Sequence, residues 1–153
     1  MVEDIEYVKA GAIGLGASWD DIIIIRNGDI KQFEEEMRKL FDLVSENRDK
    51  GEETYIHINF SGHAIIRDGF TQVVCNVESD QEEPLYNLEK NIRLLSEEEG
   101  VFVTSLFVCS RENRRQDLII QEEVDIHEAG VNRNQNLIMI FSCEQGSKAI
   151  GNT

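Results

Sequence analysis

Two short polar segments of this chain could act together in catalysis, and each follows an apolar run. His63 stands shortly after the run that ends at Phe60, and Ser110 directly follows the run that ends at Cys109. The imidazole of histidine is a natural general base near neutral pH, and a thiol or hydroxyl is the nucleophile that such a base activates. The pattern therefore predicts a nucleophile–base pair of His63 with Ser110 or Cys109.

This pair needs a fold that brings the ends of two strands together. Open α/β sheets place their chemistry outside the carboxyl ends of parallel strands, so two successive strands would deliver both residues into one crevice. Acyl transfer also needs N–H groups that face the developing oxyanion, and the amides of Ala64 and of the nucleophile are candidates. This chemistry requires no cofactor. A metal site is not predicted, because the spacing of His57, His63 and Cys109 matches no metal motif.

The elements expected around these segments are strands that alternate with amphipathic helices. Apolar runs predict strands at 22–25, 54–60, 101–109 and 137–141, with a hairpin at 70–77. The β-branched run at 22–25 is typical of a strand buried on both faces. Apolar residues three or four apart predict helices at 3–18, at 30–48 with Asp29 as the N-cap, and at 84–100 with Pro84 in the first turn. This alternation predicts an α/β fold, a mostly parallel sheet with helices on both faces.

Length and composition indicate one globular domain that spans residues 1–153. The hydrophobic share is 41% and the charged share is 29%, which is typical of a folded chain. Thirty acidic and fifteen basic residues give a net charge of −15, which excludes the usual nucleic-acid binder and disfavours anionic membranes. No apolar stretch is long enough to span a bilayer, and no secretion signal opens the chain. Three widely spaced cysteines fit a reducing, cytoplasmic compartment.

Three segments carry motifs in the order in which one peptidase family has them. Ile58–Ala64 ends in Ser-Gly-His-Ala, Leu106–Asn113 contains Val-Cys-Ser-Arg, and Leu137–Ala149 carries a strand and a polar turn. Together they resemble the caspase-like cysteine peptidases, closest to the paracaspases and metacaspases, where the first two motifs read Ser-Gly-His-Gly and Asp-x-Cys-Arg. His63 precedes Ser110 by about 50 residues, which is also the base-to-nucleophile separation in caspases.

The resemblance implies roles for individual residues. His63 would be the general base, and position 110 would hold the nucleophile. Gly62, Ala64 and Arg111 would form the oxyanion and substrate-binding site. The expected partner is a peptide or protein substrate.

The chain departs from the family pattern at five positions. Ser110 stands at the nucleophile position, and Cys109 lies one residue early. A serine is a far poorer nucleophile there than a thiol, because a thiol is partly ionised near neutral pH. Ala64 replaces a glycine, and Val108 and Lys148 replace residues that set specificity in the family. The side chain preferred at the cleavage site therefore stays open.

The resemblance also implies that the chain is a fragment of the domain. Family members have a central strand before the first helix, and they continue into further helices and a strand. We therefore expect the first strand and the C-terminal part of the fold to be lacking. Association with the missing part, or a homodimer, would complete the sheet, because a missing central strand leaves unpaired edges.

Three hypotheses for function follow. The first is a caspase-like cysteine-type endopeptidase domain that hydrolyses peptide bonds, inactivated by Ser110 if no other nucleophile replaces the family cysteine. The second is a catalytically silent caspase-like module that binds a peptide or another domain. The third is an unrelated doubly wound ligand-binding domain.

Overall fold

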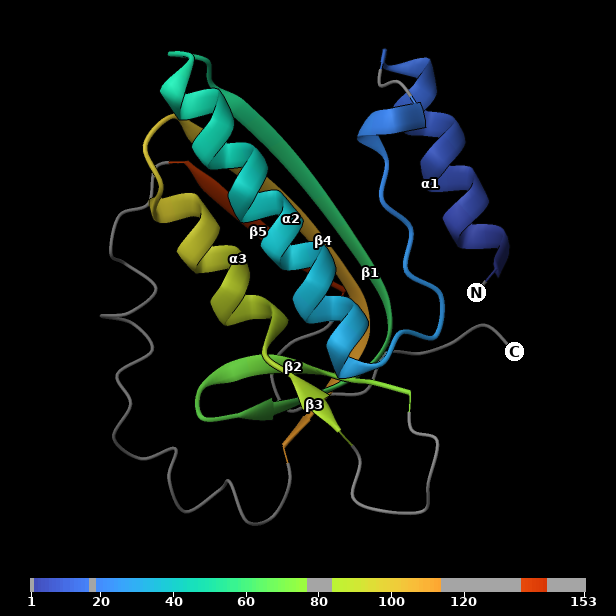
Figure 1. The fold of residues 1–153 in the computed structure, drawn as a ribbon. Coiled ribbons are helices and arrows are strands. Elements are labelled where there is room, and N and C mark those ends of the chain that lie inside the picture. The colour runs from blue at the N-terminus through green and yellow to red at the C-terminus, as the bar shows by residue number, and fades with distance from the viewer. Residues whose placement is uncertain (1, 17–18, 77–83, 114–135, 143–153) are drawn as a thin grey trace.

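The computed structural model describes residues 2–16, 19–76, 84–113 and 136–142 (Figure 1). Their elements are α1 (Val2–Gly14), the 3-10 helix η1 (Trp19–Asp21), α2 (Ile30–Asp49), β1 (Thr54–Arg67), β2 (Phe70–Val74), β3 (Leu85–Tyr86), α3 (Leu88–Glu97), β4 (Val101–Asn113) and β5 (Leu137–Phe141). The chain thus has the α/β class expected from its sequence. No helix in these ranges is long and apolar enough to cross a bilayer.

The five strands form one mixed sheet in the order β3-β2-β1-β4-β5. β1 pairs in parallel with β4, and β4 pairs in parallel with β5. β2 pairs antiparallel with both β1 and β3. Of the hairpin expected at 70–77, residues 70–74 form one strand, and its partners are residues 64–67 of β1 and 85–86 of β3. The centre of the sheet is therefore parallel, as expected, and its parallel strands β1 and β4 are joined through α3, the crossover that such strands require.

The helix α2 follows its sequence signals closely. The Asp29 carboxylate accepts a hydrogen bond from the Gln32 backbone N–H at 2.8 Å, which caps the first turn. Along the helix, Met37 and Val44 are buried in the core and Phe33 packs against it. These residues share one face at helical spacing, so local patterning accounts for this element.

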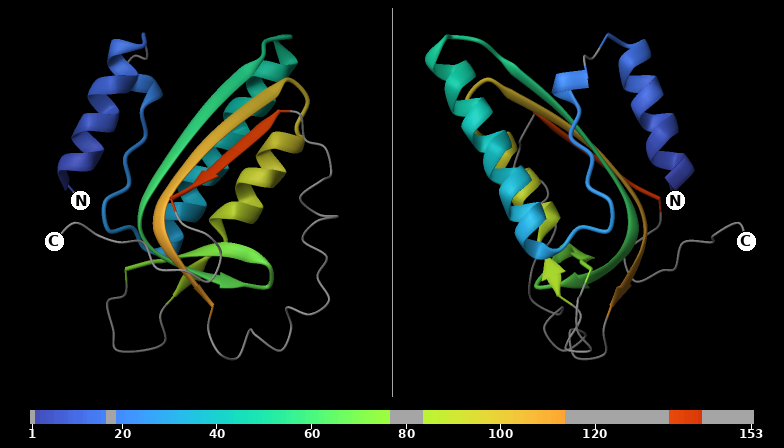
Figure 2. Two further views of the ribbon diagram at one scale, coloured as in Figure 1. Left: turned by 180° about the vertical axis from the view of Figure 1, so that it is seen from behind. Right: turned by 45° about the vertical axis from the view of Figure 1, so that its right-hand side comes forward.

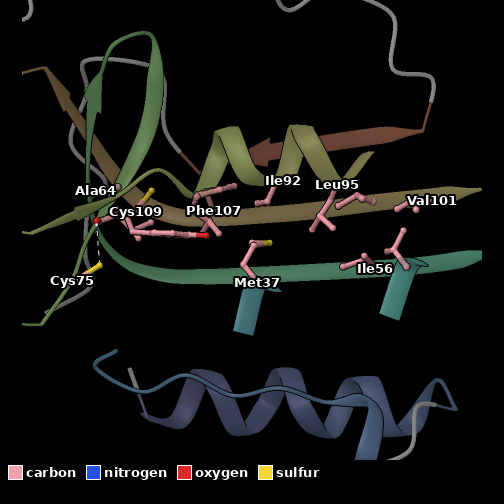
Figure 3. Packing of buried hydrophobic residues seen from close by; sticks show 14 residues of the cluster. Met37, Ile56, Ala64, Cys75, Ile92, Leu95, Val101, Phe107 and Cys109 are labelled. Carbon is pink, nitrogen blue, oxygen red and sulfur yellow. Dashed lines mark hydrogen bonds between the residues drawn. The ribbon is translucent and has the colours of Figure 1, made fainter. Parts of the chain in front are cut away.

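The hydrophobic core lies between α2, α3 and one face of the sheet. Met37, Ile92, Leu95, Ile56 and Phe107 are among its buried members, and Figure 3 shows them converging from both helices and from β1 and β4. Both helices lie on the same side of the sheet (Figure 2). Burial of apolar side chains in this single layer is the main stabilising term.

The start of α3 differs from the expectation. Pro84 lies before β3, and the helix begins at Leu88 with Asn87 as its N-cap, whose side chain accepts a hydrogen bond from the Lys90 backbone N–H. An asparagine at the N-cap accepts a hydrogen bond from a free N–H of the first turn. Proline is only compatible with the first turn and gives no such hydrogen bond. Leu85 pairs with Val74 as part of β3 instead of facing the core from the helix.

The second face of the sheet is not covered by a helix among the described residues. Its side chains include Tyr55, which is 72% exposed, and Ile138, which is 58% exposed. No residue of α1 belongs to the core cluster. The expectation of helices on both faces is therefore corrected for the described ranges: α2 and α3 cover one face only.

The run at 22–25 is extended but is not a strand of the sheet. Ile23 is exposed, and the other three isoleucines are only partly buried. The prediction of a strand buried on both faces is wrong for this structure. A β-branched run indicates an extended backbone, but it does not guarantee a partner strand.

Candidate functional site

The two predicted site residues lie side by side on neighbouring strands. His63 of β1 is in register with Ser110 of β4 in the parallel ladder, and neighbouring strands are about 4.8 Å apart. The predicted strand ends are wrong, because β1 continues to Arg67 and β4 continues to Asn113. His63 is exposed and lies within the strand instead of in a turn after it. The register brings positions 63 and 110 together, as the sequence hypothesis requires.

The second candidate nucleophile, Cys109, lies on the covered side of the sheet. It is 3% exposed and belongs to the core together with Phe107 and Ala64 (Figure 3). Its register partner in β1 is Gly62 and not His63. Successive residues of a strand point to opposite faces. Hence the Cys109 thiol and the exposed His63 imidazole do not share a face of the sheet.

Ser142, which lies in the Leu137–Ala149 motif but has no predicted role of its own, anchors the strand beside Ser110. The Ser142 hydroxyl accepts the Cys109 backbone N–H at 3.1 Å and donates to the Cys109 carbonyl at 3.3 Å. The Ser142 backbone N–H also donates to the Phe107 carbonyl at 2.9 Å. Ser142 thus holds the β4 backbone at Phe107 and Cys109, directly before position 110. The only signal in the sequence is that Ser142 is the first polar residue after the β5 run.

Of the proposed oxyanion residues, Ala64 lies between two strands of the sheet, whereas Gly62 is paired only with β4 among the described residues. Ala64 is paired with Val73 of β2 and with Arg111 of β4, so its amide lies between two strands and not in an open turn. A side chain added at Gly62 would come within 3.1 Å of the Phe60 ring, so the glycine makes room for that ring. Arg111 is located by its backbone in β4, in register with Ala64.

The other histidine of β1 is satisfied by its neighbours on the open face. His57 Nδ1 lies 2.6 Å from the Thr104 hydroxyl, and His57 Nε2 lies 2.7 Å from the Asn59 side-chain nitrogen. His57 is thus a satisfied residue on the open face of the sheet. Both ring nitrogens are engaged, so His57 is a matched control for His63 and not a second base.

Cys75, which directly follows β2, has a poorly reactive thiol. Burial raises the pKa of Cys75 to about 11, and the nearby Asp29 carboxylate adds to this rise. Burial also raises the pKa of Tyr86 to about 12, with a smaller contribution from Glu34. Cys75 is buried in the core cluster, as expected for a small apolar-like residue. A thiol with this pKa is protonated at neutral pH and is a poor nucleophile.

The described ranges contain no candidate metal site, and three other residues named from the sequence lie outside these ranges. Within the described ranges, no group of three or more His, Cys, Asp or Glu side chains could hold a metal ion. His127, Cys143 and Lys148 lie outside the described residues.

No protein-family model, curated protein or solved structure matches this chain.

Proposed function

We propose that this chain is a caspase-like cysteine-type endopeptidase domain in which serine occupies the nucleophile position. The observation that carries the proposal is the register of His63 with Ser110 on adjacent parallel strands. Covalent peptide hydrolysis needs a base within hydrogen-bond reach of the nucleophile, and register partners on neighbouring strands are close enough for such a contact. The order of β1, β4 and β5 in the sheet is compatible with the caspase-like fold.

The proposed chemistry follows from these positions. The group at position 110 attacks a peptide carbonyl while His63 takes its proton. The C–N bond then breaks, and His63 returns the proton to the leaving amine. Water activated by His63 hydrolyses the resulting acyl-enzyme. With a hydroxyl at this position the first step is slow, because a thiol ionises far more readily than a hydroxyl.

The alternative is a silent caspase-like module that binds a partner without cleaving it. The burial of Cys109 favours this alternative, because no described thiol shares the exposed face with His63. In this case the serine at position 110 leaves the module catalytically silent. Association with a further part of the domain, or formation of a homodimer, stays a prediction under both functions.

Replacement of Ser110 by cysteine tests the proposal. The full chain with Ser110→Cys is incubated with fluorogenic peptides that end in Arg, Lys, Asp or an uncharged residue, and with a peptidyl acyloxymethyl ketone probe. Ser110→Ala is the matched control, because it removes the hydroxyl without adding a thiol. We expect cleavage and labelling with Ser110→Cys and neither with Ser110→Ala.

The outcomes separate the two functions. Labelling of the introduced thiol that disappears with His63→Ala supports the endopeptidase. No cleavage and no labelling by a variant that retains the wild-type circular dichroism spectrum would overturn it and leave the silent module.

A further inference from the structure

The sheet face turned away from α2 and α3 carries no Asp, Glu, Lys or Arg at its described positions. This open face comprises the odd-numbered positions 55–63 of β1, the even-numbered positions 102–108 of β4, and positions 138 and 140 of β5, which the parallel register places side by side. In the left view of Figure 2 the face is turned towards the reader, and no described helix crosses it. Because 29% of all residues are charged, an uncharged surface of this extent is unusual for this protein.

The open face exposes large apolar side chains. Ile138 is 58% exposed, Ile140 is 55% exposed and Val108 is 47% exposed. On the same face the rings of Tyr55 and Phe102 stack, with their centroids 5.0 Å apart. Parallel strands are normally covered on both faces, and contiguous exposed apolar surface marks interaction sites. The open face therefore has the properties of an interface.

Polar side chains of the open face are already paired with one another. His57 Nδ1 contacts the Thr104 hydroxyl, and His57 Nε2 contacts the Asn59 side chain. Burial of a polar group is costly mainly when it leaves the group without a hydrogen-bond partner. These three groups supply partners for each other, so the face can be covered without most of that cost.

Charge favours a second copy of this chain as the occupant of the open face. The chain has a net charge of −15, so two copies repel each other wherever their acidic surfaces meet. A contact between two open faces avoids this juxtaposition of like charges. A basic partner, in contrast, would be attracted to the acidic surfaces and not to an uncharged one.

The open face is also complementary to itself. Its polar positions lie mainly along β1, whereas β4 and β5 contribute mainly aliphatic and aromatic side chains. A two-fold axis that lies between two such sheets, perpendicular to the strands, places β1 over β1 and the β4–β5 pair over β4–β5 of the second copy. Polar positions then meet polar positions and apolar positions meet apolar ones, as an isologous interface requires.

The size of the open face indicates a weak dimer. Strand rise and strand spacing give the face an extent of roughly 30 Å by 15 Å, so two copies would cover on the order of 900 Å². Specific stable interfaces bury about 1,200–2,000 Å² in total, and smaller ones belong to weak associations. We therefore expect reversible association that increases with protein concentration.

We propose that the open face is a self-association surface, through which two copies of this chain pack sheet against sheet. The contact is between the faces of the two sheets. It does not use the unpaired strand edges through which a homodimer would complete the sheet. This inference goes beyond the proposed function and does not rest on peptidase activity.

Sedimentation velocity of the full chain over an about hundred-fold concentration range tests the proposal. We expect the weight-average sedimentation coefficient to rise with concentration. The association should be stronger at about 0.5 M than at about 0.05 M NaCl, because salt screens the repulsion between two acidic copies.

Substitutions on the two sides of the sheet locate the contact. Val108→Glu on β4 and Ile140→Glu on β5 each add negative charge to the open face and should weaken the association at least about ten-fold. Leu43→Glu is the matched control, because Leu43 is 44% exposed on α2, which packs on the other side of the sheet. It should change the dissociation constant by less than about two-fold.

Circular dichroism spectra show whether each variant retains the wild-type fold. A wild-type chain that stays monomeric over the whole concentration range would overturn the proposal. Equal weakening by Leu43→Glu and by the two open-face variants would do the same, since it would assign the contact to another surface. Weaker association at high salt would also overturn the proposal, because it would show that opposite charges hold the copies together.

Discussion

His63 of β1 and Ser110 of β4 are direct register partners in a parallel ladder, while Cys109, one residue earlier, pairs with Gly62 and lies in the core. This one-residue offset separates the register partner of His63 from a residue that is buried in the core. Of the two candidate nucleophile positions, only position 110 is therefore in register with His63.

The two described histidines should behave differently in a Ser110→Cys background. His63→Ala should lower kcat/KM by about 10²- to 10⁴-fold, because the general base is lost. His57→Ala is the matched control: it lies on the same strand, but its ring is engaged by Thr104 and Asn59. Initial rates with the best peptide substrate give both values. Equal losses in the two variants would contradict the role of His63.

Cys109 should act as a core residue. Cys109→Ala should lower the free energy of unfolding by about 1–2 kcal/mol, because a buried group is removed from a packed site. The same change should leave probe labelling of a Ser110→Cys protein intact. Urea denaturation and mass spectrometry of the labelled protein measure the two effects. Loss of labelling without loss of stability would show that Cys109 takes part in the chemistry.

The buried carboxylate of Glu89 should stabilise the contact between α3 and β2. It accepts the Thr71 backbone N–H at 2.6 Å and also pairs with Arg93 at 3.0 Å. Glu89→Ala removes the carboxylate that accepts the buried Thr71 N–H, so we expect a loss of about 2–4 kcal/mol in the free energy of unfolding. Asp42→Asn, which removes an exposed ion pair, should change it by less than about 1 kcal/mol. Similar urea midpoints for the two variants would contradict this assignment.

Stability should fall at alkaline pH. The pKa of Cys75 is raised from 9.0 to about 11 and that of Tyr86 from 10.0 to about 12, so the folded state binds these protons more tightly than the unfolded state. The corresponding stability is complete below pH 9 and is lost as the pH rises through 9–12. Between pH 7.5 and 10.5 we expect a loss of about 2–3 kcal/mol.

Urea denaturation at the two pH values measures this loss. Cys75→Ala is the informative control, since it should remove the larger part of the pH dependence in this interval. An unchanged pH dependence in Cys75→Ala would show that other groups cause it.

Asp29 should have two separable effects. Asp29→Ala removes the N-cap of α2 and should cost about 1 kcal/mol of stability. Asp29→Asn keeps an acceptor for the Gln32 N–H but removes the charge that helps to raise the Cys75 pKa. Cys75 should then be alkylated faster at pH 9 with little change in stability. Alkylation rates at pH 9 that are equal in wild type and Asp29→Asn would exclude this electrostatic coupling.

Local sequence determined the elements whose stability comes from neighbouring residues. The α2 helix follows from the Asp29 cap and the spacing of Phe33, Met37 and Val44, and all of these appear in the structure. Helix periodicity and capping act within a few residues, so they can be read from the chain alone. The same holds for the apolar centres of β1, β4 and β5.

Tertiary structure alone decided where the strands end and which runs have partners. Ser61–Ala64 resembles a turn in sequence, yet it stays in β1 because β4 pairs with its backbone throughout. The run 22–25 resembles a buried strand, yet no described strand pairs with it. Strand pairing joins residues that are distant in the chain, so no local pattern encodes it. For the same reason the sequence named both Ser110 and Cys109, and only the register showed which of them stands beside His63.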